Sequence, residues 1–487
     1  MDLRKRGGPS TDFNNEPLTS ADSTKVGTLT NSAHDVASPR FRVRWAVLAI
    51  DFLVLGLNYA DRAAISVAAP FIISEFGFSK GTFGLILSVF FFGYVPFTFI
   101  GGYTSDKIGP RKVMGAAVAW WSLFTALTAL GYNFISFMII RFLFGFGEGP
   151  QASVTAKTMS NWFPQREFGR ALGISQSSTP LGGAVAAPLV AGILALSNHN
   201  WRIAFIVLGV IGFLFALGWF VVVRDRPEQH PWITQGEIQE IHGGDVARQT
   251  AGAASSGEDV AAAAAPSVWS YMRKPLVLAT GLAFFGYAWV LYVFLSWFPT
   301  FLVEVYKIDL SSLAIGGSLP WIAGFAGFCA GGFLTDWLAQ RTGRPAATRK
   351  WIIVVNLLAT AALFALTGAI ATVVMAVVLM ASVVFLLYTT GAQYFAIIGD
   401  LVPSSRYGGV VGFVHLIANL AGILAPFVTG RIVDTTGSWA LTFGLAAAIC
   451  AAGAIIMAIF GRIGELEAEI RSRTADATPG ASRPASP

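Results

Sequence analysis

Long apolar runs, separated by short segments that carry most of the charged residues, extend from about residue 44 to residue 461. A bilayer core about 30 Å thick requires about 20 residues of helix. By this measure the pattern predicts an all-α integral membrane protein with twelve transmembrane helices. The predicted helices are 44–72, 81–105, 113–131, 134–159, 169–195, 203–223, 276–302, 313–338, 351–370, 372–399, 408–433 and 440–461.

Polar segments divide the chain into five parts. Residues 1–43 are rich in Ser, Thr, Asn and Asp and have no apolar core, so we expect a disordered cytoplasmic tail. Six predicted helices fill 44–223 and six fill 276–461. The run AGAASSGEDVAAAAAPS lies in 224–275, which we expect to be a cytoplasmic linker too poor in large apolar residues to form its own core. Residues 462–487 form a predicted cytoplasmic C-terminal tail.

Composition supports this organisation. Charged residues make up 12% of the chain, whereas soluble proteins carry about 25%. The net charge of +6 is spread over many short clusters, which argues against a nucleic-acid partner. With the N-terminus inside, the inner segments hold 27 of the 33 Lys and Arg residues. This bias predicts a multi-pass protein of the plasma (inner) membrane with both termini in the cytoplasm.

The two predicted halves resemble one another. GGYTSDKIGPRK follows the second predicted helix and GGFLTDWLAQRTGR follows the eighth, and both place a Gly pair five residues before Asp. In a second match, a Pro is followed five residues later by Gly, once after the fourth predicted helix and once after the tenth. Two matches at corresponding places predict a duplicated six-helix unit. Paired Gly permits close helix contact, and an Asp at a helix end can pair with basic loop residues. We therefore expect a conformational latch formed by Gly102, Asp106, Arg111 and Asp336.

Four charged residues lie inside apolar runs: Asp61 and Arg62 in the first predicted helix, and Arg141 and Glu148 in the fourth. A charge at that depth costs at least about 2.5–3.5 kcal/mol, so chains retain such groups where they have a function. Arginine binds carboxylates through paired charge-assisted hydrogen bonds, and a partly desolvated Asp or Glu can exchange protons. The residues predict carriage of an anion together with protons. The alternative is two static ion pairs that brace the helices, Asp61 with Arg141 and Glu148 with either Arg62 or Arg141.

Four motifs support a family resemblance: NYADRAAISVAAP (58–70), RFLFGFGEGPQ (141–151), SWFPTFL (296–302) and ANLAGILAP (418–426). With twelve helices in two halves, the chain resembles the major facilitator superfamily, and within it the anion:cation symporter family of bacterial galactonate, glucarate, hexuronate and phthalate transporters. This resemblance implies the major facilitator fold, with two pseudo-symmetric six-helix halves. The first two motifs are the specific ones.

The resemblance also implies the roles of individual residues. It assigns substrate binding to Arg62 and Arg141, with Tyr and Asn side chains for a polyhydroxylated acid, and proton coupling to Asp61 and Glu148. The implied Tyr and Asn residues are Tyr59, Tyr94, Tyr287, Tyr292 and Asn419. Tyr287 stands where the vesicular glutamate carriers of the family have a basic residue, which argues against a substrate needing a third cation. Asp51, earlier in the first helix, is expected to make gating contacts.

We therefore expect proton-coupled uptake of a small organic anion by alternating access, with a sugar acid such as galactonate, glucarate or a hexuronate as the substrate. An aromatic acid of the phthalate type is the alternative, because Trp289 and Trp297 lie near the expected cavity. STPLGGAVAAP faintly resembles an antiporter motif, which leaves an antiporter or drug exporter as a further alternative. No catalytic cluster or metal-ligand spacing is present in the sequence, so we expect no enzyme, cofactor or metal. The expected partners are the acid, protons and lipid, around a monomer.

Overall fold

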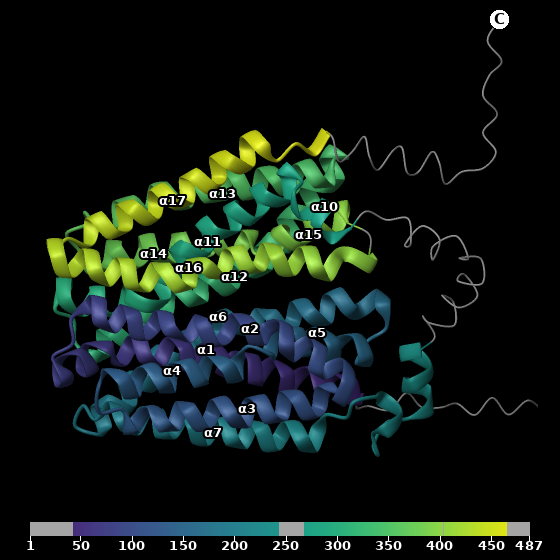
Figure 1. The fold of residues 1–487 in the computed structure, drawn as a ribbon, viewed down its shortest axis with the longest axis horizontal. Coiled ribbons are helices and arrows are strands. Elements are labelled where there is room, and N and C mark those ends of the chain that lie inside the picture. The colour runs from purple at the N-terminus through teal and green to yellow at the C-terminus, as the bar shows by residue number, and fades with distance from the viewer. Residues whose placement is uncertain (1–41, 243–266, 403, 465–487) are drawn as a thin grey trace, which may run out of the picture. The chain divides into compact units, whose positions relative to one another are not determined.

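The computed structural model describes residues 42–242, 267–402 and 404–464, and the regular secondary structure within these ranges is helical (Figure 1). The predicted tails, apart from a few residues, and residues 243–266 of the predicted linker lie outside the described residues.

Several helices of the first half begin with side-chain caps. The Ser79 hydroxyl accepts a hydrogen bond from the Thr82 amide, and Asn133 forms a capping box with Ser136. The helices are α1 (Val43–Phe76), α2 (Lys80–Ile108), α3 (Pro110–Leu127), η1 (Thr128–Leu130), α4 (Phe134–Glu148), α5 (Gln151–Trp162), α6 (Gln165–Leu196) and α7 (Trp201–Val222).

The second half repeats this order after the short helix α10. The Asp309 carboxylate caps α12 by accepting a hydrogen bond from the Ser312 amide at 2.9 Å. The helices are α10 (Val268–Met272), α11 (Pro275–Tyr306), α12 (Leu310–Thr342), α13 (Pro345–Thr367), α14 (Val373–Thr390), α15 (Gln393–Leu401), α16 (Ser404–Thr436) and α17 (Trp439–Phe460).

Within the described ranges, 11 helical segments are long and apolar enough to cross a membrane. The predicted span 134–159 is the one missing from this set, and the structure divides it into α4 and α5, of 15 and 12 residues. The division falls at Gly149-Pro150, where proline lacks the N–H that would continue the helix. The predicted span 372–399 is divided in the same way into α14 and α15.

The helix pairs of the first half recur in the second. The pairs α1–α6, α2–α4 and α3–α7 correspond to α11–α16, α12–α14 and α13–α17. A Cβ atom on Gly101 would lie 2.4 Å from Pro150, and one on Gly331 would lie 2.4 Å from the Thr389 carbonyl oxygen. The first Gly of each repeated pair therefore permits the same close helix approach in both halves. This confirms the predicted pseudo-symmetry.

The two halves meet most firmly at one end of the bundle, which we call the closed end. There the Asp434 carboxylate accepts hydrogen bonds from the Lys80 and Gly81 amides at 2.8 and 2.6 Å, and Lys80 pairs with Glu304 at 3.2 Å. The main contacts between halves are α2 with α16 and α6 with α12. At the opposite end, α5 and α15 pack chiefly against helices of their own half.

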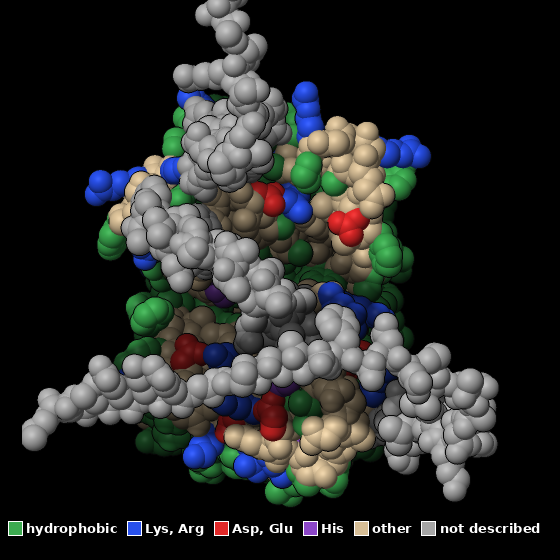
Figure 2. All heavy atoms as spheres, turned by 90° about the vertical axis from the view of Figure 1, so that its right-hand side faces the viewer, with side chains coloured by type: hydrophobic (Ala, Val, Ile, Leu, Met, Phe, Trp, Pro, Cys, Tyr) green, Lys and Arg blue, Asp and Glu red, His purple; other side chains and the backbone are tan. Residues whose placement is uncertain are grey.

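We call that opposite end the basic end, after Arg42, Arg44, Arg111 and Arg349. Figure 2 looks onto the side at the right of Figure 1 and shows Lys, Arg, Asp and Glu side chains gathered there. Arg349 forms an ion pair with Asp400 at this end. Backbone caps and ion pairs therefore concentrate where the helices of each half begin or end.

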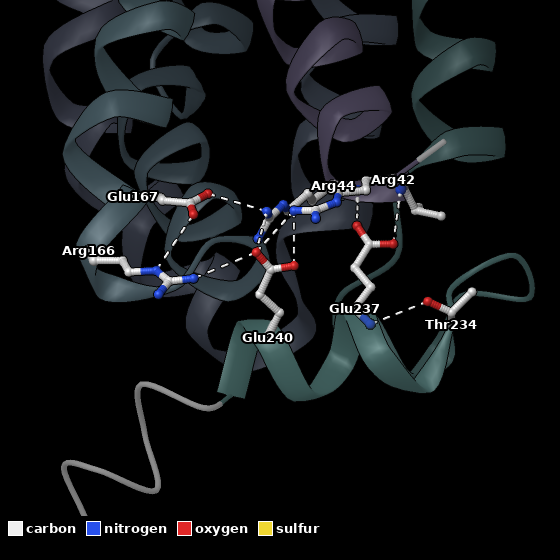
Figure 3. A network of polar contacts seen from close by, with 8 residues as sticks. Arg42, Arg44, Arg166, Glu167, Thr234, Glu237 and Glu240 are labelled. Atoms are coloured by element: carbon white, nitrogen blue, oxygen red, sulfur yellow. Dashed lines mark hydrogen bonds and ion pairs between the residues drawn. The ribbon is translucent and has the colours of Figure 1, made fainter. Parts of the chain in front are cut away.

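The start of the expected linker is folded against the first half (Figure 3). Residues 235–242 are helical, and the Glu237 carboxylate accepts hydrogen bonds from the Val43 and Arg44 amides at 3.1 and 3.0 Å, which caps α1. Glu240 pairs with Arg42 and Arg44, each at 3.0 Å. Burial alone would raise the pKa of Glu240, but these two arginines outweigh it and lower the pKa. Composition did not indicate this contact, because it depends on two acidic residues rather than on an apolar core.

We predict that Gly182→Ala destabilises the protein, whereas Gly192→Ala in the same helix does not. A Cβ atom on Gly182 would lie 1.9 Å from the Gly56 carbonyl oxygen of α1, but nothing lies within 4 Å of one on Gly192. Overpacking of this kind costs about 1–3 kcal/mol. Thermal unfolding in detergent measures the difference in Tm. Equal Tm values for the two variants would contradict the close α1–α6 approach.

Candidate functional site

The central ion pair of the site joins α1 to α4. The Nε atom of Arg62 donates a hydrogen bond to Glu148 Oε2 at 2.6 Å, and the two side chains are 7% and 0% exposed. The Arg62 guanidinium also lies over the rings of Tyr94, Phe90 and Tyr59, at 4.5, 4.8 and 5.4 Å from their centroids. Cation–π contacts of this kind help to hold the guanidinium in place beside Glu148. Of the two ion pairs considered from the sequence, the structure contains this one.

Arg141 lies near the same site, without an acidic partner in the part of the chain that the structure describes. It is 5% exposed, and its guanidinium lies 4.6 Å from the Phe144 centroid and 5.3 Å from that of Phe90. Among the described residues, its side chain forms no hydrogen bond or ion pair, and its Nε is buried. Arg141 is therefore a buried cation held by aromatic faces, with its donors available to an anion.

Asp61 is the unpaired acid of the site. It is 2% exposed and lies beside Thr125, yet neither carboxylate oxygen has a hydrogen bond of ordinary geometry within the described chain. It is within electrostatic range of Glu148 and Arg141 but is not in contact with the arginine. The Asp61–Arg141 ion pair of the static alternative is absent from the described residues. A buried carboxylate without a partner is costly, which favours its protonated form.

The second half contributes neutral polar groups. The Tyr292 hydroxyl donates to Asn419 Oδ1 at 3.0 Å, and the Tyr292 ring packs on Phe91 of α2 at 4.6 Å. Tyr292 lies near enough to Arg62, Tyr59 and Tyr94 to interact with them electrostatically, and Tyr287 interacts in the same way with Tyr59. The structure thus brings the nine predicted binding and coupling residues around one region between the halves.

The predicted latch residues lie at the basic end, away from this region. Asp106 pairs with Lys157 of α5 at 2.9 Å, and Gly102 packs on Ser153 of the same helix. The backbone amide of Arg111 donates to Asp225 at 2.9 Å, and its side chain donates to the Phe220 carbonyl at 2.7 Å. Asp336 is exposed. The Asp106 and Arg111 contacts stay within the first half, and the latch itself stays a prediction.

A small apolar cavity of about 10 Å³ lies between the halves on the closed-end side of Arg62. Its lining includes Ala63, Val67, Phe298 and Trp321. It has no charged group and is the size of one water molecule, so it is not the anion site. Its small volume shows instead that α1, α6, α11 and α12 pack closely together on the closed-end side of the site.

Some site residues were not singled out from the sequence. Phe90 contacts both arginines, and Tyr388 of α14 is within electrostatic range of Tyr59, Tyr287 and Tyr292. Aromatic residues are so frequent in the apolar runs that spacing alone does not separate these from ordinary packing residues.

Comparison with known proteins places the chain among transporters. The family described as Major Facilitator Superfamily matches residues 52–395. The hexuronate transporter of Bacillus subtilis (strain 168) is 38% identical over 413 residues, which cover 84% of this chain and 93% of that protein. A probable sulfoacetate transporter of Cupriavidus necator is 32% identical over 417 residues, covering 85% and 93%. The crystal structure of a D-xylose-proton symporter has a TM-score of 0.68 at 14% identity, covering 85% and 97%, which is a similarity of fold.

We predict that Glu148→Leu destabilises the protein more than the double change Arg62→Met with Glu148→Leu. The single change leaves the Arg62 charge buried without its partner, which costs about 3–5 kcal/mol, whereas the double change replaces the pair by apolar side chains. Thermal unfolding of the three proteins in one detergent measures the coupling. A double variant less stable than the single one would show that the pair itself is the stabilising element.

Proposed function

The chain belongs to the major facilitator superfamily, and from this premise we propose that it is a secondary active transporter that takes up a small organic anion together with protons. Its helices cross the membrane many times, and its family consists of transporters rather than enzymes. The observation that carries the proposal is Arg141, a buried arginine without an acidic partner among the described residues, beside a second arginine and two acids.

Arg141 is the reason that we propose an anion as the substrate. Its guanidinium is 5% exposed, so an anion that reaches it gains an interaction in a medium of low dielectric constant. A carboxylate matches the planar array of guanidinium donors through two parallel hydrogen bonds. Arg62 is close to the same region but is neutralised by Glu148. The anion's carboxylate therefore binds first to Arg141.

Proton binding is coupled to anion binding because Glu148 and the substrate compete for Arg62. The Glu148 carboxylate and a substrate carboxylate are alternative partners of that guanidinium, so protonation of Glu148 releases Arg62 to the substrate. Asp61, buried without a hydrogen bond in the described chain, carries a second proton that removes its repulsion of the anion. Proton and anion binding thus favour each other, which is the thermodynamic requirement of symport.

A sugar acid of the hexuronate type is the proposed substrate. The relative from B. subtilis is named a hexuronate transporter. On the side of the second half, Tyr287, Tyr292 and Asn419 supply hydroxyl and amide groups instead of charges, and these suit the hydroxyls of a sugar. We place the protein in the inner membrane with the basic end and both termini in the cytoplasm, because Lys and Arg are concentrated at that end.

We predict that Arg141→Gln lowers uptake of labelled D-glucuronate into proteoliposomes by about 10- to 100-fold at subsaturating substrate. Loss of a charge-assisted hydrogen bond costs about 1.5–3 kcal/mol. Arg273→Gln is the matched control, because that arginine is exposed at the end of α10 and should leave uptake unchanged. Unlabelled D-glucuronate, phthalate and sulfoacetate are compared as competitors. Uptake by Arg141→Gln equal to wild type would refute the proposed anion site.

We predict that Asp61→Asn abolishes accumulation driven by a pH gradient but retains exchange of labelled for unlabelled substrate. The amide cannot take up a proton, whereas exchange requires no net proton movement. Glu228→Gln, a change outside the membrane helices, is the control that should accumulate substrate normally. Accumulation by Asp61→Asn that still collapses with a protonophore would remove this residue from the coupling mechanism.

A further inference from the structure

A second buried carboxyl group lies in α1 on the basic-end side of the site. Asp51 is 0% exposed, and its two carboxylate oxygens accept hydrogen bonds from the Thr155 hydroxyl of α5 at 2.8 Å and from the Ser175 hydroxyl of α6 at 2.5 Å. Asp51 lies eleven residues before Arg62, which is about 16 Å along the helix and on nearly the same face.

Polar side chains lie between this carboxyl group and the site. On α1, Asn58 lies between Asp51 and Arg62 and beside Glu148. On the facing helices, Glu148 is followed by Gln151 and Thr155, whose side chains are joined by a hydrogen bond of 3.1 Å. We call the set Arg62, Glu148, Asn58, Gln151, Thr155, Asp51 and Ser175 the polar ladder. Each member is no more than 7% exposed, in helices otherwise packed with apolar residues.

The ladder contains polar atoms whose hydrogen-bonding capacity is unused. Within the described residues, both amide atoms of Asn58 and the Oε1 atom of Glu148 are buried without a hydrogen bond of ordinary geometry, although Asn58 lies beside Glu148. Buried polar groups without partners are rare in proteins and call for an explanation. Here the Glu148 oxygen belongs to the carboxyl group at the site, and Asn58 lies between that group and the carboxyl group of Asp51 nearer the basic end. A change of protonation at either carboxyl group therefore changes which neighbouring atoms donate hydrogen bonds and which accept them.

The surroundings of Asp51 provide no compensating charge. Its polar neighbours from α5 and α6 are the two hydroxyl groups, and α7 faces this part of α1 with Gly218, near Ile50. No Lys, Arg or His in the described part of the chain forms an ion pair with Asp51. An ionised carboxylate buried without a cation is unfavourable, whereas the neutral acid can donate to a hydroxyl oxygen that turns to accept.

We propose that Asp51 is a further proton-binding site of the transporter, connected to Glu148 by the polar ladder, and that it loads and releases one proton in each transport cycle. This inference rests on the proposed proton coupling. On loading, an O–H bond forms at an Asp51 oxygen with a proton from one aqueous compartment. On release, that bond breaks and the proton passes to the other compartment, so the protein is unchanged over the cycle.

The test is the number of protons transported per molecule of D-glucuronate. It is measured in proteoliposomes as the membrane potential and pH gradient at which a fixed substrate gradient gives no net flux. We expect Asp51→Asn to transport one proton fewer than wild type while exchange of labelled substrate continues. A ratio equal to that of wild type would overturn the proposal. A wild type without proton coupling would overturn the proposed symport itself, which separates the two failures.

A second variant changes the same site without altering Asp51. Thr155→Val with Ser175→Ala removes both donors, so the carboxyl group stays protonated and the ratio again falls by one. Thr158→Val is the matched control, because this buried hydroxyl donates to the Val154 carbonyl in α5 and not to Asp51, and it should leave the ratio unchanged. Loss of folding in both site variants would assign Asp51 a structural role and overturn the proposal.

Discussion

The ion pair between Arg62 and Glu148 is the interaction on which the proposed site depends. Its charges lie 2.6 Å apart and are nearly inaccessible to water, so each is tolerated in the membrane chiefly because of the other. Attraction at low dielectric constant is strong, which makes the pair sensitive to anything that changes one partner's charge. A proton on Glu148 or an anion beside Arg62 therefore alters the balance far more than at a protein surface. In the proposed mechanism the pair therefore connects proton binding to anion binding.

The fold places this pair by breaking a helix next to it. α4 ends at Glu148, and α5 begins at Gln151 after Gly149-Pro150. Gly149 also permits close contact with α2, since a Cβ atom there would lie 2.7 Å from the Tyr94 carbonyl oxygen. The break brings Glu148 to Arg62 and lets α5 continue along α1 at the level of Asp51. The same local feature thus positions the site and the polar ladder.

Much of the fold was predictable because it depends on long-range regularities of the chain. Apolar runs and duplicated loop motifs predicted the helices and the two halves, and the rarity of charge in the membrane identified Asp61, Arg62, Arg141 and Glu148. The static alternative paired Asp61 with Arg141 and left Glu148 a choice of Arg62 or Arg141, because residue type does not decide between the two arginines. Three-dimensional packing pairs Glu148 with Arg62 and leaves Asp61 without an ion pair among the described residues. The helix at 235–242 and the aromatic partner Phe90 were missed because ordinary composition surrounds them.

The unequal distribution of charge between the halves bears on alternating access. The four charged residues of the site lie on α1 and α4, whereas α11 and α16 contribute Tyr287, Tyr292 and Asn419, which are neutral. A substrate that binds by its carboxylate to the first half and by its hydroxyls to the second therefore joins the two without a fixed ion pair at the site. Because hydrogen bonds between neutral groups are individually weak, the second half can move relative to the first at modest cost. In the proposed cycle the charge stays with one half throughout, so the strong interactions set affinity and proton coupling while the weak ones permit the movement.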